Sequence, residues 1–103
     1  MLDMSDNIYS KDEIADVVSS LLKKYRAEEA ILFGSYARQE AHAGSDIDLV
    51  IFGGAKFELT DVFAIADELH RRMGKNVDVY EIREIDIGSA FYSTIMEEGV
   101  HIA

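Results

Sequence analysis

The segment DIDLVIF, residues 46–52, constrains the fold of this chain more than any other stretch. Side chains on successive residues of a β-strand point to opposite faces of the sheet. In this segment the branched apolar residues at positions 47, 49 and 51 share one face, whereas Asp46 and Asp48 share the other. The segment therefore predicts a strand with one face in a hydrophobic core and two carboxylates on the opposite face.

Other apolar patterns predict helices and strands that alternate along the chain. We expect amphipathic helices at 11–26, 60–73 and 87–98, a short helix at 36–40, and strands at 30–33, 46–52, 76–82 and 100–102. Residues 1–9 have the character of a loose leader. In a chain of 103 residues this alternation predicts an α/β fold, a small mixed central sheet with flanking helices, in a single domain over residues 1–103.

Several residues mark the expected helix ends. Ser10 and Glu13 fit a capping box at the start of the first helix. Thr60 is the expected N-cap of the second long helix, and Gly74 is its expected C-cap. The apolar face of this helix is expected to contain Val62, Phe63, Ile65, Ala66, Leu69 and Met73.

The composition limits the possible functions. The 20 acidic and 10 basic residues give a formal charge of −10, which disfavours direct nucleic-acid binding. The chain has no cysteine, so it holds no disulfide or thiolate metal site, and this suits a reducing cytoplasm. No apolar run approaches the ~18 residues that span a bilayer, and the acidic N-terminus is unlike a signal peptide. We expect a cytoplasmic protein that does not contact a membrane.

A third carboxylate follows the same alternation. Asp78 lies between Val77 and Val79, so it faces away from the core if its strand neighbours segment 46–52. Three convergent carboxylates repel one another by about 3 kcal/mol per pair at a separation of ~5 Å. A hard cation such as Mg²⁺ or Mn²⁺ held among the carboxylates relieves that repulsion. The alternative is a solvated edge strand whose charges discourage aggregation.

The turn Gly34-Ser35 follows the predicted strand at 30–33. Glycine allows close approach of a ligand to the backbone, and a helix that starts here aims free N–H groups at an anion. The serine hydroxyl adds one donor for a phosphate oxygen. The alternative is a plain strand-to-helix turn with a serine N-cap. Together with the carboxylates, the turn indicates phosphoryl or nucleotidyl transfer.

The stretch GSYARQEAHAGSDIDLVIF resembles the glycine-serine, spacer, aspartate-x-aspartate motif of the polymerase-beta-like nucleotidyltransferases, and NVDVY resembles their third-aspartate strand. Length and spacing are similar to those of the minimal nucleotidyltransferase (MNT) group. The resemblance covers nearly the whole chain. It implies a polymerase-beta-like nucleotidyltransferase core without the helical domain of larger relatives.

The resemblance implies a role for each matching residue. Asp46 and Asp48 would bind two Mg²⁺ ions and, through them, ATP. Asp78 would complete the second metal site and help to activate the attacking hydroxyl. Gly34 and Ser35 would hold the β- and γ-phosphates.

Two further residues, Arg38 and Ser45, occupy recurring positions of the motif. The resemblance implies that Arg38 contacts the triphosphate or a partner, and the alternative is a salt bridge to Glu40. The sequence departs from the motif at Gln39, where a glycine is usual and would ease a left-handed backbone.

The resemblance also implies a partner, because MNT proteins pair with HEPN-family RNase toxins and act as antitoxins. We expect Mg²⁺-dependent transfer of AMP from ATP to a hydroxyl of such a toxin, with tyrosine as the expected acceptor. Three alternatives stay open, namely a binding-only antitoxin, a nucleotidyltransferase for small molecules, and a structural subunit. The sequence leaves the oligomeric state undetermined.

Other polar and aromatic residues have weaker signals. Tyr36, beside the Gly-Ser turn, is a candidate for stacking on a nucleobase, although a structural role is more common. His70 is expected on a helix surface, and Phe91 and Tyr92 are expected in the core.

Overall fold

The structure is a computed structural model that describes residues 7–103, so most of the expected leader lies outside the described residues. Its elements are α1 (Lys11–Tyr25), β1 (Glu29–Phe33), α2 (Gly34–Ala37), β2 (Ile47–Phe52), α3 (Asp61–Met73), β3 (Val77–Glu81), the 3₁₀ helix η1 (Ile82–Glu84), α4 (Ala90–Glu98) and β4 (Val100–His101). Over the described part of the chain, no helix combines the length and apolarity needed to cross a membrane.

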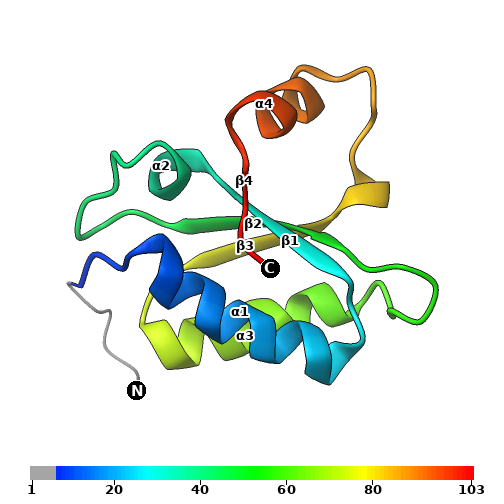
Figure 1. The fold of residues 1–103 in the computed structure, drawn as a ribbon, viewed down its shortest axis with the longest axis horizontal. Coiled ribbons are helices and arrows are strands. Elements are labelled where there is room, and N and C mark those ends of the chain that lie inside the picture. The colour runs from blue at the N-terminus through cyan, green and yellow to red at the C-terminus, as the bar shows by residue number, and fades with distance from the viewer. Residues whose placement is uncertain (1–6) are drawn as a thin grey trace.

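The strands form one mixed sheet in the order β3-β2-β1-β4, which confirms the predicted α/β fold with a mixed central sheet (Figure 1). β1 pairs antiparallel with both β2 and β4, whereas β2 and β3 are parallel and are connected by α3. In this register, Asp48 lies opposite Phe33 on one side and opposite Asp78 on the other. The pairing of three strands therefore brings the aspartate motifs together.

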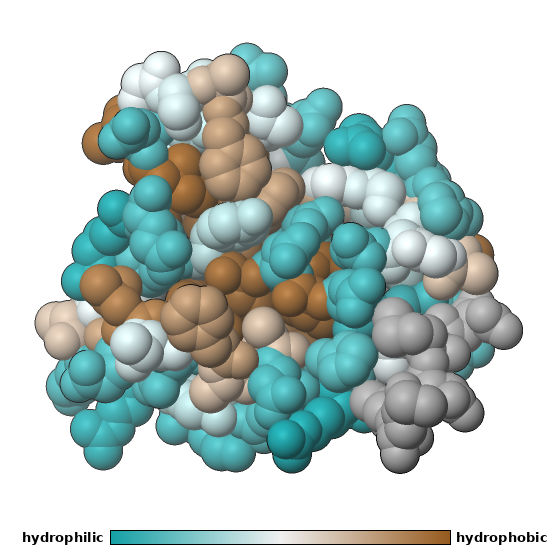
Figure 2. Space-filling view, turned by 180° about the vertical axis from the view of Figure 1, so that it is seen from behind, coloured by the Kyte–Doolittle hydropathy of each residue, from teal (hydrophilic) through white to brown (hydrophobic). Residues whose placement is uncertain are grey.

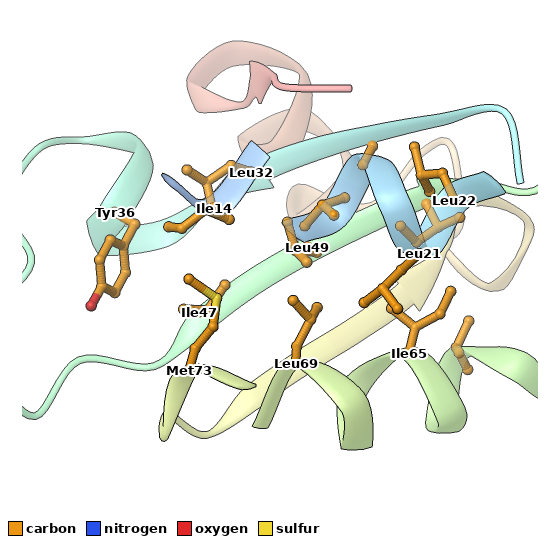
Figure 3. Packing of buried hydrophobic residues seen from close by; sticks show 14 of the residues in the cluster. Ile14, Leu21, Leu22, Leu32, Tyr36, Ile47, Leu49, Ile65, Leu69 and Met73 are labelled. Atoms are coloured by element: carbon orange, nitrogen blue, oxygen red, sulfur yellow. The ribbon is translucent and has the colours of Figure 1, made fainter. Parts of the chain in front are cut away.

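The main hydrophobic core lies between the sheet and the helices α1 and α3, which cover the same face (Figure 1). Ile47 and Leu49 of β2 lie among Ile14 of α1 and Ile65 and Leu69 of α3 (Figure 3). Each of these five side chains has no measurable exposure to solvent. Burial of one such side chain stabilises the fold by about 1.5–3 kcal/mol. The predicted alternation of β2 is thus confirmed on its apolar face.

The opposite face of the sheet carries a smaller apolar cluster beneath α4. Phe33, Val50, Ile85 and Ile95 are buried there. Val50 follows Asp48 by two residues, so the two side chains share this face. Asp48 consequently lies at the margin of an apolar cluster, which lowers the access of its carboxylate to water.

Most of the predicted helix ends are confirmed. The Ser10 hydroxyl accepts from the amide of Glu13 at 3.1 Å, and the Glu13 carboxylate accepts from the amide of Ser10 at 2.9 Å. Gly74 ends α3 in the left-handed conformation, with φ of 66°. Thr60 precedes α3 as expected, but its side chain makes no capping hydrogen bond.

Two helices begin at residues other than those expected. The short helix α2 spans Gly34–Ala37 rather than 36–40, because the amide of Arg38 already donates to the carbonyl of Gly34 at 3.1 Å. The last helix, α4, begins at Ala90 rather than at residue 87. Ser89 is its N-cap, and the Ser89 hydroxyl accepts from the amide of Tyr92 at 3.0 Å.

The predicted apolar face of α3 is wrong at Phe63. The core side of the helix consists of Val62, Ile65, Leu69 and Met73. These residues recur every three or four positions, so they form one continuous apolar stripe along the side of α3 that faces the core. Phe63 lies outside this stripe and is 76% exposed.

Gln39 adopts the left-handed backbone, with φ of 59°, at the position where the motif usually has glycine. The left-handed region costs a residue with a Cβ about 1–2 kcal/mol, and glycine loses about 0.5–1 kcal/mol through its greater freedom in the unfolded chain. We predict that Gln39→Gly raises the free energy of unfolding by about 0.5–1 kcal/mol in urea denaturation. Gln39→Ala is the matched control and should give no increase. A gain of equal size in both variants would contradict the backbone explanation.

Candidate active site

The aspartates predicted to bind metal lie on the sheet face opposite to α1 and α3. Asp48 of β2 and Asp78 of β3 are paired in register, and their side chains lie within hydrogen-bonding range of each other. Asp46 precedes β2 and adds its charge to the same site. Asp48 is half-buried, whereas Asp46 and Asp78 are exposed. The structure therefore brings two of the carboxylates into contact and sets the third beside them.

The environment raises the pKa of Asp48 from 3.8 to about 6. Burial is the largest cause, followed by the negative charges of Asp78 and Asp46, and the positive charge of Arg38 opposes the shift. Perturbed carboxylates of this kind are typical of functional sites. Asp48 consequently holds a proton below about pH 6, and a nearby cation would stabilise its ionised form.

The turn after β1 lies directly against this carboxylate. Gly34 has a φ of 72°, a conformation that side-chain-bearing residues rarely adopt. A Cβ atom placed on Gly34 would overlap with Oδ2 of Asp48. The next residue, Ser35, is half-buried in the first turn of α2. The predicted phosphate-binding turn and the predicted metal-binding strand therefore meet, and both the backbone angle and the close approach favour glycine there.

Arg38 makes the salt bridge to Glu40 that was the alternative to a substrate contact, with Nε 3.0 Å from Oε2. Its Nη1 also lies 3.5 Å from Oε2 of Glu98 at the end of α4. The guanidinium is nevertheless near enough to Asp48 to lower the pKa of that carboxyl. Arg38 thus connects α2, α4 and the carboxylate cluster.

Ser45 is buried in the loop that leads into β2. Its hydroxyl accepts from the amide of His42 at 2.9 Å, so it closes a tight turn. The same loop is anchored by the buried Lys75, whose ammonium donates to the carbonyl of Ala43 at 2.6 Å. These contacts fix the approach of the chain to Asp46.

His70 of α3 is a site residue that the sequence did not single out. It lines a cavity of about 480 Å³ together with Asp46, Asn76 and Asp78. Its Nδ1 lies 2.7 Å from the carbonyl oxygen of Lys75, and since a carbonyl only accepts, Nδ1 carries the proton. The spacing of Phe63, Ala66 and His70 marks a second stripe on α3 beside the core stripe, and this is the signal that could have located it.

Aromatic residues border the carboxylates on the same face. Phe33, Tyr80 and Phe91 have ring centroids 5.4–6.3 Å apart in tilted and edge-on arrangements. Phe91, expected in the core, is 38% exposed at this edge. Tyr36, in contrast, is only 4% exposed within the main core, so it is not available for base stacking (Figure 3).

The donor chemistry of the site fits a hard divalent cation. Carboxylate oxygens are the ligands that Mg²⁺ prefers, and a cation would relieve the repulsion that raises the pKa of Asp48. Within residues 7–103, the side chains as they stand do not gather three acidic or histidine groups into a metal-binding set. Asp48 and Asp78 are the pair in position to share a ligand, and Asp46 is the additional donor on the same face.

The raised pKa of Asp48 predicts a pH-dependent stability in metal-free buffer. The folded state holds an extra proton between pH 3.8 and about 6, so stability is lost as the pH rises through this window. Asp48→Asn removes the penalty and should be more stable than the wild type above pH 6 by about 1–2 kcal/mol, after allowance for solvent screening at a half-exposed group.

The measurement is urea unfolding with EDTA at several pH values between 4 and 8. The exposed carboxylate of α1 provides a control, because Asp16→Asn should follow the wild-type pH profile. Parallel profiles for Asp48→Asn and the wild type would contradict the assignment.

Comparison with known proteins identifies the family. The family described as "Polymerase beta, Nucleotidyltransferase" matches residues 16–103. A relative from Methanocaldococcus jannaschii, named a "putative protein adenylyltransferase", is 36% identical over 74 residues, which cover 72% of this chain and 80% of the relative.

Solved structures show the same fold. A toxin–antitoxin structure with AMP-PNP aligns with a TM-score of 0.74 at 20% identity, covering 86% of this chain and 72% of the other. A tri-AMPylated Shewanella oneidensis HEPN toxin in complex with an MNT antitoxin aligns with a TM-score of 0.69 at 17% identity, covering 90% and 71%. At these low identities the solved structures support the fold alone, whereas the family assignment rests on the sequence matches. With its paired aspartates set against a glycine-serine turn, the chain belongs to the polymerase beta nucleotidyltransferase family.

Proposed function

We propose that this protein is an antitoxin that transfers AMP from ATP, with Mg²⁺, to a hydroxyl of a HEPN-family RNase toxin, with tyrosine as the acceptor residue. The observation that carries the proposal is the close approach of Gly34 to the Asp48 carboxylate, which is paired in register with Asp78. A triphosphate bound at the turn would place its α-phosphorus beside these carboxylates. The relatives described above support the chemistry and the class of partner.

Each site residue has a role in this proposal. Asp46 and Asp48 hold the metal of the nucleotide, and Asp78 completes the metal site and orients the acceptor hydroxyl. Bound Mg²⁺ supplies charge stabilisation for an in-line displacement at phosphorus, in which pyrophosphate leaves. The backbone at Gly34 and the hydroxyl of Ser35 hold the outer phosphates.

Arg38 and Ser45 have supporting roles. The positive charge of Arg38 near Asp48 opposes the negative charge of the cluster and favours an anionic substrate. Ser45 positions the loop before Asp46 through its bond to His42. Arg38 therefore acts on the triphosphate directly, and Ser45 acts through the loop.

A protein acceptor suits the open site better than a small molecule does. The carboxylates face solvent at the sheet surface, and no second domain within residues 7–103 encloses them. A small acceptor would have few contacts there, whereas a protein partner supplies the missing wall. The net charge of −10 favours a basic partner surface and disfavours direct contact with nucleic acid. A cytoplasmic location belongs to the same proposal.

Loss of a metal-binding carboxylate should reduce nucleotide binding. We predict that Mg²⁺-ATP raises the melting temperature of the wild type through mass action and raises that of Asp46→Asn much less. Differential scanning fluorimetry with and without Mg²⁺-ATP measures both shifts. Asp16→Asn, remote from the site on α1, should respond like the wild type. Equal shifts for Asp46→Asn and the wild type would be incompatible with the metal assignment.

A substitution at Asp78 separates catalysis from simple binding. Asp78→Asn keeps the size of the side chain and removes its charge, so the surface presented to a toxin changes little. We predict that the wild type adds AMP to the purified cognate toxin and that Asp78→Asn adds none, as measured by intact mass after incubation with ATP and Mg²⁺. Suppression of toxicity by both proteins, with the toxin unmodified, would establish a binding-only antitoxin instead.

A further inference from the structure

β3 is an edge strand of the sheet, and its open side borders α3. Two concavities lie along this border, one of about 260 Å³ and the other of about 480 Å³. They share Ala66, Val77 and Asp78, so they form one continuous depression, which we call the α3–β3 trough. The trough therefore ends at the carboxylate that the proposed function assigns to the acceptor hydroxyl.

The two halves of the trough differ in chemistry. The smaller half is mainly apolar, and its lining contains Phe63, Val62, Val77, Val79 and Tyr80 beside the carboxylates of Asp78 and Glu84. The larger half is acidic and contains Asp46, Asp67 and Asp78 with His70. Figure 2 shows an apolar patch in the middle of this face of the molecule, framed by hydrophilic side chains. Phe63 is 76% exposed, an unusual placement for a large aromatic residue that no core contact explains.

The backbone of β3 offers unused hydrogen-bonding groups on the same side. The amide of Ile47 donates to the carbonyl of Asn76 at 2.9 Å. In a parallel pair of strands, this bond identifies which residues of β3 form backbone hydrogen bonds with β2. Asn76, Asp78 and Tyr80 therefore direct their backbone groups towards β2. Val77 and Val79 direct theirs towards the open edge, where an added strand can pair with them.

We propose that the α3–β3 trough binds the acceptor polypeptide as an extended segment added to the edge of β3. This inference rests on the proposed function and names how the acceptor is recognised. The bound segment has a hydroxyl side chain opposite Asp78, apolar residues on either side of it, and basic residues beyond them. Edge addition of this kind uses main-chain bonds for affinity and alternate side-chain pockets for specificity.

The alternation of side chains decides where each residue of the segment lies. A side chain opposite Asp78 points to the carboxylate face of the sheet, and its two neighbours point to the α3 face, where Phe63 is exposed. The next residues return to the carboxylate face, whose local charge is negative at Asp46 and Glu84. The five residues of β3 set the length of the segment at about five residues.

The probe is the synthetic peptide Lys-Val-Tyr-Val-Lys with blocked ends, which presents the same pattern in either strand direction. Two matched peptides replace both lysines by glutamate or carry N-methyl groups on the three central amides. Binding is followed by amide chemical shifts of the ¹⁵N-labelled protein, and AMP transfer is followed by peptide mass with ATP and Mg²⁺. We expect the basic peptide to shift the amides of β3 and Phe63, and both matched peptides to lose binding.

Variants of the protein complete the test. Phe63→Asp removes the apolar anchor at an exposed helical position and should raise the KM for the peptide about tenfold or more, with Mg²⁺-ATP binding unchanged. Ile87→Asp is the matched control, since Ile87 is 78% exposed and lies outside the trough, and it should behave like the wild type.

Each outcome decides one of the two claims. Unchanged kinetics in Phe63→Asp, equal binding of the N-methylated or acidic peptide, or no binding of the basic peptide would overturn the docking inference. AMP transfer to the cognate toxin in any of those cases would leave the proposed function standing. Peptide binding in the trough without AMP transfer would support the docking site and contradict the proposed function.

Discussion

The site depends on one close contact, in which the backbone of Gly34 lies against the Asp48 carboxylate. Antiparallel pairing of β1 and β2 sets Phe33 opposite Asp48, so the chain must turn directly over that carboxylate when β1 ends. A Cβ at this position would displace Oδ2 of Asp48, and the left-handed φ of 72° favours glycine for a second reason. The turn, the first N–H groups of α2 and the carboxylates are thereby held together, as a site for phosphate and metal requires.

The same arrangement is electrostatically unfavourable until a ligand arrives. Burial and neighbouring charges raise the pKa of Asp48 to about 6, so the carboxylate cluster opposes full ionisation. Packing of β2 against α1 and α3 on the opposite face of the sheet stabilises the fold and offsets this repulsion. One face of β2 therefore contributes apolar side chains to the core, and the other face contributes a carboxylate to the candidate site.

The fold and the elements that carry the candidate site residues could be predicted because they depend on short-range patterns. Alternation in β2, the glycine-serine turn and the capping box of α1 each occupy a few consecutive residues, and each was found in place. The sequence patterns did not place Phe63 and His70 beside the candidate site. Both lie on α3 beside the core stripe, and a helical pattern does not reveal whether a neighbouring stripe faces solvent, a core or a site.

Side-chain periodicity and turn chemistry are local properties, so the elements, the buried face of β2 and the residue types of the candidate site could be inferred from short stretches of the chain. The tertiary structure alone decided that β3 pairs with β2 at Asp48–Asp78 and that its other edge stays open. It also decided that α3 leaves Phe63 exposed beside that edge. Strand order and the packing angle of a helix arise from contacts between residues far apart in the chain, so no stretch of sequence specifies them separately.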